Sequence, residues 1–166
     1  SAFSVFLGTN PSGSLDNPGG TVGCGPLPLT FPISAGNNTP GTLYIITFND
    51  GTAPITYSHP PPPNITHVFS TGSCGTTSTD GTNTYQHSFS ANLLIVNPCG
   101  TSGSTVLPIS VSLMPTAAFT ISPNDTACVG QPVTFGNTSV GNDIQGNFCV
   151  TVPALLWSIV PATGWT

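Results

Sequence analysis

The chain has 166 residues without a single lysine or arginine, and its only acidic residues are five aspartates. Nucleic acids and anionic lipids are bound through cations that neutralise phosphate, and three mostly neutral histidines are a poor substitute, so the composition argues against both as partners. Short apolar runs predict a folded chain rather than a disordered one, and none approaches the roughly 20 residues of a transmembrane helix, so we expect no direct membrane insertion.

Glycine and proline, 19 and 18 residues respectively, interrupt the chain at short intervals, as in an all-β protein with many turns. Threonine, serine and asparagine must then supply the solubility that charged residues usually give, which is typical of secreted surface proteins. The sequence begins without methionine or a signal peptide, so we expect Ser1 to be an internal or processed end of a mature secreted fragment.

Apolar and β-branched runs predict a series of strands in the first two thirds of the chain. In residues 27–33, for example, apolar side chains alternate with proline or threonine, the period of two that a half-buried strand requires. Asn49–Thr52 predicts a hairpin, because Asp50-Gly51 tolerates the positive φ values of a tight primed turn. The predicted strands are Ala2–Leu7, Leu27–Ile33, Leu43–Phe48, Ile55–Tyr57, Ile65–Phe69, Tyr85–Val96 and Thr105–Ser112.

The segments between these strands are rich in turn-forming residues. Pro60–Pro63 cannot donate ladder hydrogen bonds and is predicted to be an extended connection. Residues 71–84 are predicted to be a polar loop around Cys74, and Asn97–Gly100 is the predicted turn into the last strand. The number and spacing of the strands are those of an immunoglobulin-like sandwich, so residues 1–113 are predicted to form one complete module.

The strand pattern starts again after residues 114–116, which are predicted to be a short, stiff linker. Ala117–Ser122 repeats the pattern of the opening strand. Val133–Phe135 follows Cys128 as the second strand of the first module follows Cys24. This is an internal repeat with a cysteine just before the second strand of each copy.

Residues 117–166 are therefore predicted to be the N-terminal part of a second module, too short to close a sandwich. Its expected third strand is Leu155–Val160, with Trp157 as a core aromatic. Either the sequence is cut within this module or the missing strands come from elsewhere. The predicted fold class is all-β, with immunoglobulin-like modules in tandem and the second module incomplete.

Several segments, in this order along the chain, resemble the polycystic-kidney-disease (PKD) type immunoglobulin-like repeats of very large Bacteroidota surface proteins. The resemblance implies tandem sandwich modules that are exported by the type IX secretion system to the outer cell surface, as in giant gliding-motility adhesins. The matching segments are Leu43–Thr52, His59–Pro63, His67–Phe69, Asn97–Gly100, Cys128–Ser139 and Trp157–Thr166.

Catalysis needs groups that transfer protons or attack a substrate, held close together. His59, His67 and His87 are the only side chains with an ordinary pKa near neutrality, and their positions beside a proline run or within strands favour structural roles. Without glutamate, and with most aspartates in turn motifs, the chain offers no clear pair of carboxylates for glycoside hydrolysis. We therefore expect no enzymatic activity.

Calcium is the cofactor that the sequence allows, because adhesin modules often bind Ca²⁺ through aspartate, asparagine and backbone oxygens. Asp50 and Asp80 are the candidate ligands, although the glycine after each explains both equally well as turn residues. No Cys-x-x-Cys or His-x-x-x-His spacing suggests zinc. Apart from this calcium hypothesis, no cofactor is predicted.

The cysteines suit an oxidising compartment, and we expect disulfides in preference to metal ligation or redox chemistry. Cys24 and Cys74 are expected at the same end of the sandwich, which makes a bridge between them reasonable. Cys99 is expected at the opposite end, and Cys149 could pair with a cysteine outside this sequence. The five disulfide candidates are Cys24, Cys74, Cys99, Cys128 and Cys149.

Thr126 is the candidate for covalent sugar attachment. The triplet Asp125-Thr126-Ala127 resembles the O-glycosylation motif of Bacteroidota, in which the threonine is the acceptor. The expected product would be a surface glycoprotein.

These observations predict a spacer and adhesive module of a large surface protein or filament, which contacts its partners weakly and many times over. The expected partners are neighbouring modules of the same chain and surface polysaccharides or other surface proteins. One alternative is a carbohydrate-binding module of a secreted hydrolase, with Tyr57 or Tyr85 stacking on sugar rings. Another is a fibre subunit whose incomplete module accepts a strand from its neighbour.

Overall fold

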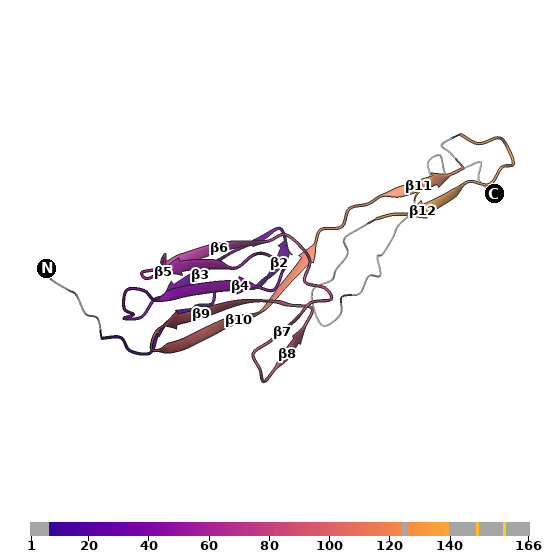
Figure 1. Cartoon of the computed structure of the whole chain (residues 1–166). Coiled ribbons are helices and arrows are strands. Elements are labelled where there is room, and N and C mark those ends of the chain that lie inside the picture. The colour runs from indigo at the N-terminus through magenta and orange to yellow at the C-terminus, as the bar shows by residue number, and fades with distance from the viewer. Residues whose placement is uncertain (1–6, 124–125, 140–148, 150–157, 159–166) are drawn as a thin grey trace.

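The computed structural model describes residues 7–123, 126–139, Cys149 and Ser158, and the described part is all-β (Figure 1). The prediction of an all-β fold is confirmed. The strands are β1 (Ser14–Leu15), β2 (Val22–Gly25), β3 (Leu27–Ser34), β4 (Leu43–Phe48), β5 (Ile55–Ser58), β6 (Asn64–Phe69), β7 (Thr77–Thr79), β8 (Thr84–Gln86), β9 (Phe89–Asn97), β10 (Gly100–Leu113), β11 (Phe119–Ser122) and β12 (Thr134–Asn137).

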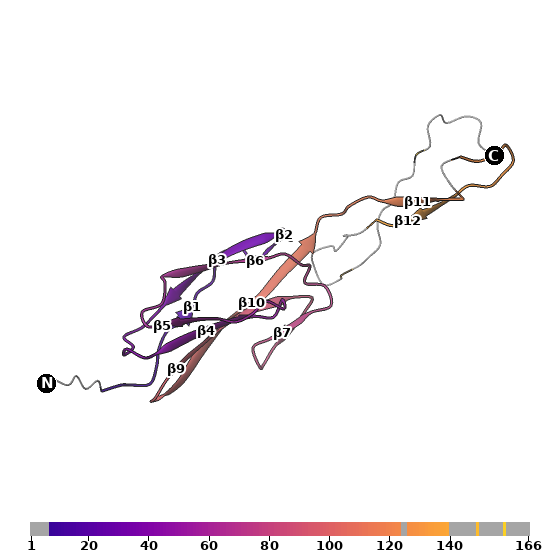
Figure 2. The same ribbon diagram turned by 45° about the horizontal axis from the view of Figure 1, so that its top comes forward.

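Two sheets pack face to face and form what we call the sandwich, residues 7–113 (Figures 1 and 2). One sheet has three strands in the order β1-β3-β6, and the other has five in the order β2-β10-β9-β4-β5. The opening of the chain contributes to both, because β1 pairs antiparallel with β3 whereas β2 pairs parallel with β10. The remaining pairs within the two sheets are antiparallel.

The core lies between the two sheets and follows from the alternation seen in the sequence. Leu29, Phe31 and Ile33 of β3 point inward and are buried, while Thr30 and Pro32 between them are exposed. Across the core, Phe69 of β6 stacks on Phe89 of β9 with ring centroids 5.5 Å apart. Burying each such side chain contributes roughly 1.5 to 3 kcal/mol, so the aromatic contacts hold the sheets together.

The predicted strand Tyr85–Val96 is interrupted at His87. This residue adopts a left-handed conformation with φ of 55°. Its carbonyl oxygen accepts a hydrogen bond from the Ser73 hydroxyl at 2.7 Å, and its Nδ1 accepts one from the Gly75 N–H at 3.1 Å. The bend separates β8 from β9, so the prediction of one continuous strand is wrong.

The strand β8 pairs with β7 and forms a two-stranded ribbon, which we call the β7–β8 ribbon. The ribbon spans residues 77–86, and residues 77–84 belong to the segment that was predicted to be a loop. The ribbon projects from the sandwich (Figure 1), and its strands expose mainly threonine and glutamine. Without an apolar face, these strands lack the alternation by which a sequence indicates a strand.

A second two-stranded element, the β11–β12 hairpin, follows the sandwich (Figures 1 and 2). It confirms the strands predicted at residues 117–122 and 133–135. The predicted linker before it is exposed, with Met114 70% accessible. The strands predicted at Ala2–Leu7 and Leu155–Val160, and the core role of Trp157, lie outside the described residues except at Leu7 and Ser158, which belong to no strand. The division into two modules stays a prediction.

Candidate functional site

Among the aspartates that the structure describes, Asp50 has the most enclosed setting, directly after β4. One carboxylate oxygen, Oδ1, accepts hydrogen bonds from the Thr52 N–H at 3.1 Å and the Thr52 hydroxyl at 2.7 Å. Gly51 between them has φ of 91°, a conformation that glycine adopts without strain. The predicted hairpin is present, but β5 starts only at Ile55, so a loop of residues 49–54 replaces the tight turn that we expected.

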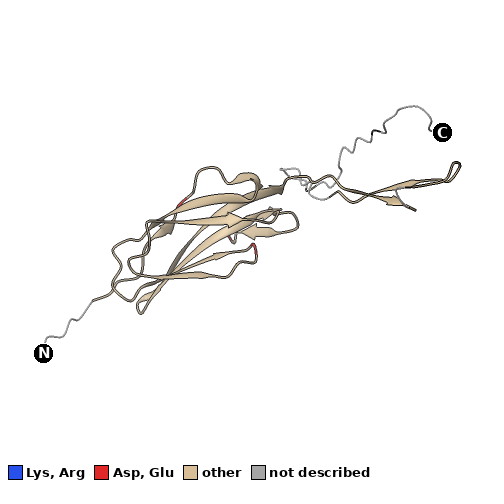
Figure 3. Cartoon of the chain, turned by 90° about the horizontal axis from the view of Figure 1, so that it is seen from above, with Lys and Arg blue, Asp and Glu red and all other residues tan. Residues whose placement is uncertain are grey.

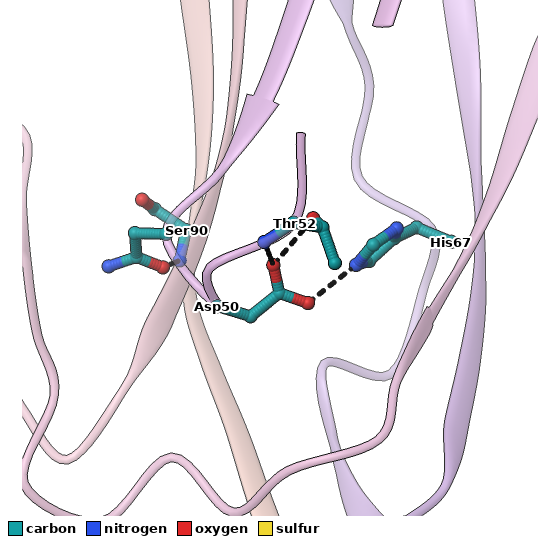
Figure 4. A network of polar contacts seen from close by, with 5 residues as sticks. Asp50, Thr52, His67 and Ser90 are labelled. Atoms are coloured by element: carbon teal, nitrogen blue, oxygen red, sulfur yellow. Dashed lines mark hydrogen bonds and ion pairs between the residues drawn. The ribbon is translucent and has the colours of Figure 1, made fainter. Parts of the chain in front are cut away.

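The other carboxylate oxygen, Oδ2, lies 2.7 Å from Nε2 of His67 on β6 (Figure 4). The side chains of Asp50 and His67 are only 3% and 11% exposed. The imidazole stacks on Phe48 with ring centroids 3.7 Å apart and meets the edge of Phe69 at 4.6 Å. Because His67 belongs to the three-stranded sheet and Asp50 follows a strand of the other, the pair joins the two sheets.

The surroundings of Asp50 change its pKa in two directions. Burial of the carboxylate raises the pKa, whereas the hydrogen bonds from His67 and Thr52 lower it by more. The net effect is a pKa below the ordinary value of 3.8, so the group is ionised at neutral pH. An enclosed carboxylate of this kind depends on its partners, and removing one of them leaves a charge without compensation.

The geometry around the Asp50–His67 pair is that of a structural contact. In a nucleophilic relay, the carboxylate orients an imidazole whose other nitrogen takes a proton from the attacking hydroxyl. Here the Thr52 hydroxyl donates to Asp50 itself, on the carboxylate oxygen that His67 does not use. The hydroxyl therefore fixes the turn, and the histidine fixes the turn to β6.

The other two histidines lie in separate contacts. Nδ1 of His59 is 3.0 Å from the hydroxyl of the fully buried Tyr44, which donates to the Ala35 carbonyl at 2.7 Å and accepts from the Asn38 amide. His87 joins the bend before β9 to the Gly75 N–H. Within the described ranges, no group of three histidine, cysteine or acidic side chains is placed to hold a metal ion.

Asp80, the second calcium candidate, lies in the turn of the β7–β8 ribbon. Its carboxylate accepts hydrogen bonds from the N–H groups of Asn83 and Thr82 at 2.7 and 2.8 Å, and these bonds lower its pKa. Asp50 and Asp80 thus both cap the backbone two residues further on, which is the turn function that the following glycines indicated. Their use as calcium ligands stays a prediction.

The described cysteines contain one disulfide, between Cys74 and Cys149, whose Cα atoms are 5.6 Å apart. The predicted Cys24–Cys74 bridge is therefore wrong, as is the expectation that Cys149 pairs outside this sequence. Cys24 belongs to an unpredicted edge strand, where pairing with β10 places it opposite Ser112 and exposes its thiol. Cys99 and Cys128, in the β9–β10 turn and the β11–β12 connection, are also exposed free thiols.

A buried serine, which was not predicted, holds Cys74 in place. The Ser73 N–H donates to the Val111 carbonyl at 2.9 Å, and the Ser73 hydroxyl accepts from the Val111 N–H at 3.0 Å. Through these bonds the loop before β7 lies against β10. Ser73 is only 3% exposed, yet its neighbours in the sequence are polar and give no sign of burial.

Thr126, the predicted sugar acceptor, lies in the connection between β11 and β12 and is exposed. Ala127, the third residue of the motif, is exposed as well, and Asp125 lies outside the described residues. Accessibility is what an acceptor threonine requires, and the modification itself stays a prediction.

Comparison with protein-family models, with curated proteins and with solved structures gave no match to this chain. In the described part of the chain, no helix is long and apolar enough to cross a membrane. Figure 3 shows how sparse the charge is: no basic residue appears, and the acidic residues are few and separated.

Proposed function

We propose that this chain is a non-enzymatic, extracellular part of a large surface protein, built from PKD-type immunoglobulin-like modules that act as spacers and weak multivalent adhesive units. The strand order supports the immunoglobulin-like assignment. The order β1-β3-β6 opposite β10-β9-β4-β5 corresponds to strands A-B-E opposite G-F-C-C′ of an immunoglobulin sandwich.

The observation that carries the spacer role is the direction of the chain. The segment before β1 lies beside the β9–β10 turn, where the Asn97 amide donates to the Thr9 carbonyl at 3.0 Å. From that turn β10 runs 14 residues, roughly 40 Å, before the chain leaves the sandwich. Entry and exit therefore lie at opposite ends (Figure 1), which is what modules joined in series require.

The contacts of the polar side chains support the non-enzymatic assignment. The three histidines make three separate structural contacts, and the Asp50 and Asp80 carboxylates cap turns. The carbohydrate-binding alternative receives less support, because Tyr57 packs against the core and is only partly available to a sugar ring. The strand-accepting alternative concerns residues 117–166, many of which lie outside the described ranges.

Valency is the property that tests this function. We would immobilise neutral and acidic polysaccharides and compare retention of the single chain with retention of the same chain displayed as a tetramer. Weak multivalent adhesion predicts no measurable retention of the single chain and clear retention of the tetramer, because linkage raises overall avidity by about 10² to 10⁴. Tight binding by the single chain, or cleavage of the polysaccharide, would contradict the proposal.

A further inference from the structure

One surface of the sandwich combines exposed apolar side chains with a complete lack of charge. It is the outer side of strands β5, β4, β9 and β10, which we call the β4–β9 face. The strand pairing arranges its residues in three rows across the sheet. These rows are Ser58-Leu43-Val96-Thr101, Thr56-Ile45-Leu94-Gly103 and Thr47-Asn92-Thr105.

The centre of the β4–β9 face is aliphatic. Leu43 and Leu94 are 39% and 45% exposed, and Ile45 and Val96 lie between them partly exposed. Hydroxyl-bearing residues of β5 and β10 form the two sides. In the third row the Thr105 hydroxyl donates to the side-chain amide oxygen Oδ1 of Asn92 at 2.9 Å, so these polar groups are already paired within the sheet. Contiguous exposed aliphatic residues with a polar border are typical of interaction surfaces.

The shape of the β4–β9 face is complementary to itself. Leu94 protrudes, and its direct neighbour across the β9–β10 pair is Gly103, which has no side chain. When two copies meet about a two-fold axis, each contact occurs twice, so the Leu94 side chain of each copy can lie over Gly103 of the other. We propose that the β4–β9 face is a self-association surface on which a second copy of this chain docks face to face.

The neutral, aliphatic character of the face favours a second copy over other occupants. None of the five aspartates belongs to the face, and the chain has no cation with which to form an ion pair. A partner must therefore present a neutral, partly aliphatic surface, and the same face on another copy does so. A sugar would be held by stacking on aromatic rings, and the three rows contain none.

The size of the face indicates a weak contact. Four strands about 4.8 Å apart, over five residues of about 3.4 Å each, cover roughly 300 Å² per copy. A stable complex buries about 800 Å² per partner, so we expect a dissociation constant on the order of 1 mM for single chains. The inference does not depend on the proposed function, since it concerns the isolated chain.

The test is a dilution series of the whole chain by NMR, from about 1 mM to about 20 µM, with sedimentation measured in parallel. Leu94→Asp places a charge at the centre of the face. Val68→Asp is the matched control, because Val68 is also 45% exposed but lies on β6 of the other sheet. Gly103 is left unchanged, since a Cβ there would lie 2.9 Å from the Leu93 carbonyl oxygen.

We expect concentration-dependent shifts confined to the β4–β9 face, their loss in Leu94→Asp, and their retention in Val68→Asp. Added salt should leave the association unchanged or strengthen it, because both copies carry net charge −5 and no ion pair joins them. Three results would overturn the inference: no concentration dependence up to about 1 mM, equal loss in both variants, or shifts of this face only when a neutral oligosaccharide is added.

Discussion

The sandwich and the β11–β12 hairpin use the same sequence pattern and reach different degrees of burial. Ile46 of β4 is fully buried, whereas Ile121 of β11, which lies between Thr120 and Ser122, is 36% exposed. The difference is the second sheet, which covers Ile46 and has no counterpart over the hairpin in the described part of the chain. Alternation specifies a strand, but a facing layer makes its apolar side a core.

Removing the disulfide should have the largest effect on stability, because the bridge joins the sandwich to Cys149, a residue beyond the hairpin. Cys149→Ser should lower the free energy of unfolding by at most about 4.5 kcal/mol, since the bridge closes a loop with a sequence separation of 75 residues. Chemical denaturation of the oxidised protein measures this. Cys99→Ser, which removes an exposed free thiol, is the control and should be nearly neutral. Equal stability of the two variants would mean that the bridge does not restrict the unfolded chain.

Two isoleucines test the comparison directly. Ile46→Ala should cost about 2 to 5 kcal/mol, because it leaves a cavity between the sheets. Ile121→Ala removes the same atoms from a partly exposed position and should cost less than about 1 kcal/mol. Denaturant midpoints at constant m-value give both numbers. A cost at Ile121 as large as that at Ile46 would show that the hairpin is covered as thoroughly as the core.

The Asp50–His67 pair sharpens the comparison, since it ties the two sheets together. His67→Ala should destabilise the protein by about 3 kcal/mol, because the Asp50 carboxylate loses its partner and Phe48 loses its stacking contact. A double-mutant cycle with Asp50→Ala isolates the coupling between the two side chains. Asp80→Asn, in the other Asp-Gly turn, should have a smaller effect. If the stability losses of the two single variants simply add up in the double variant, the two side chains are not coupled and the pair does not link the sheets.

Of the four tests, lowering the pH should have the smallest effect on the free energy of unfolding until the solution is strongly acidic. The folded pKa of Asp50 lies below its ordinary value of 3.8, so its contribution is complete above that value and disappears as the pH falls through the folded pKa. The stability difference between wild type and Asp50→Asn should therefore be constant near neutral pH and shrink below pH 3.8. A difference that shrinks already between pH 7 and 5 would assign the effect to another group.

The sequence predicted those strands whose burial depends on a simple alternation. Strands β3, β4 and β6 bury apolar residues at alternate positions, and their bounds agree closely with the prediction. Strand β2 was not predicted, because its sequence, Val-Gly-Cys-Gly, has little apolar surface to bury. The strand is held by backbone pairing with β10. Strand β7 was not predicted for a similar reason, since hydroxyl groups occupy all its positions, and β8 was predicted only as the start of the strand Tyr85–Val96.

The candidate site was only partly predictable. The turn at Asp50 was expected, because Asp-Gly is a local signal that needs no knowledge of the rest of the fold. The contact with His67 was not, since it depends on how the three-stranded sheet lies over the end of β4. The same holds for Cys74, whose partner is decided by the bonds between Ser73 and Val111 and not by cysteine spacing.

The Cys74–Cys149 bridge has a consequence for a chain under tension. When the two ends are pulled apart, the covalent path of the load passes from residue 74 to residue 149 through the sulfur atoms and bypasses the residues between them. With a sequence separation of 75, about 260 Å of polypeptide cannot be drawn out while the bridge is oxidised. The strands β9 and β10 and the β11–β12 hairpin are thereby shielded from stretching, and only the segment up to Cys74 and the residues after Cys149 can lengthen.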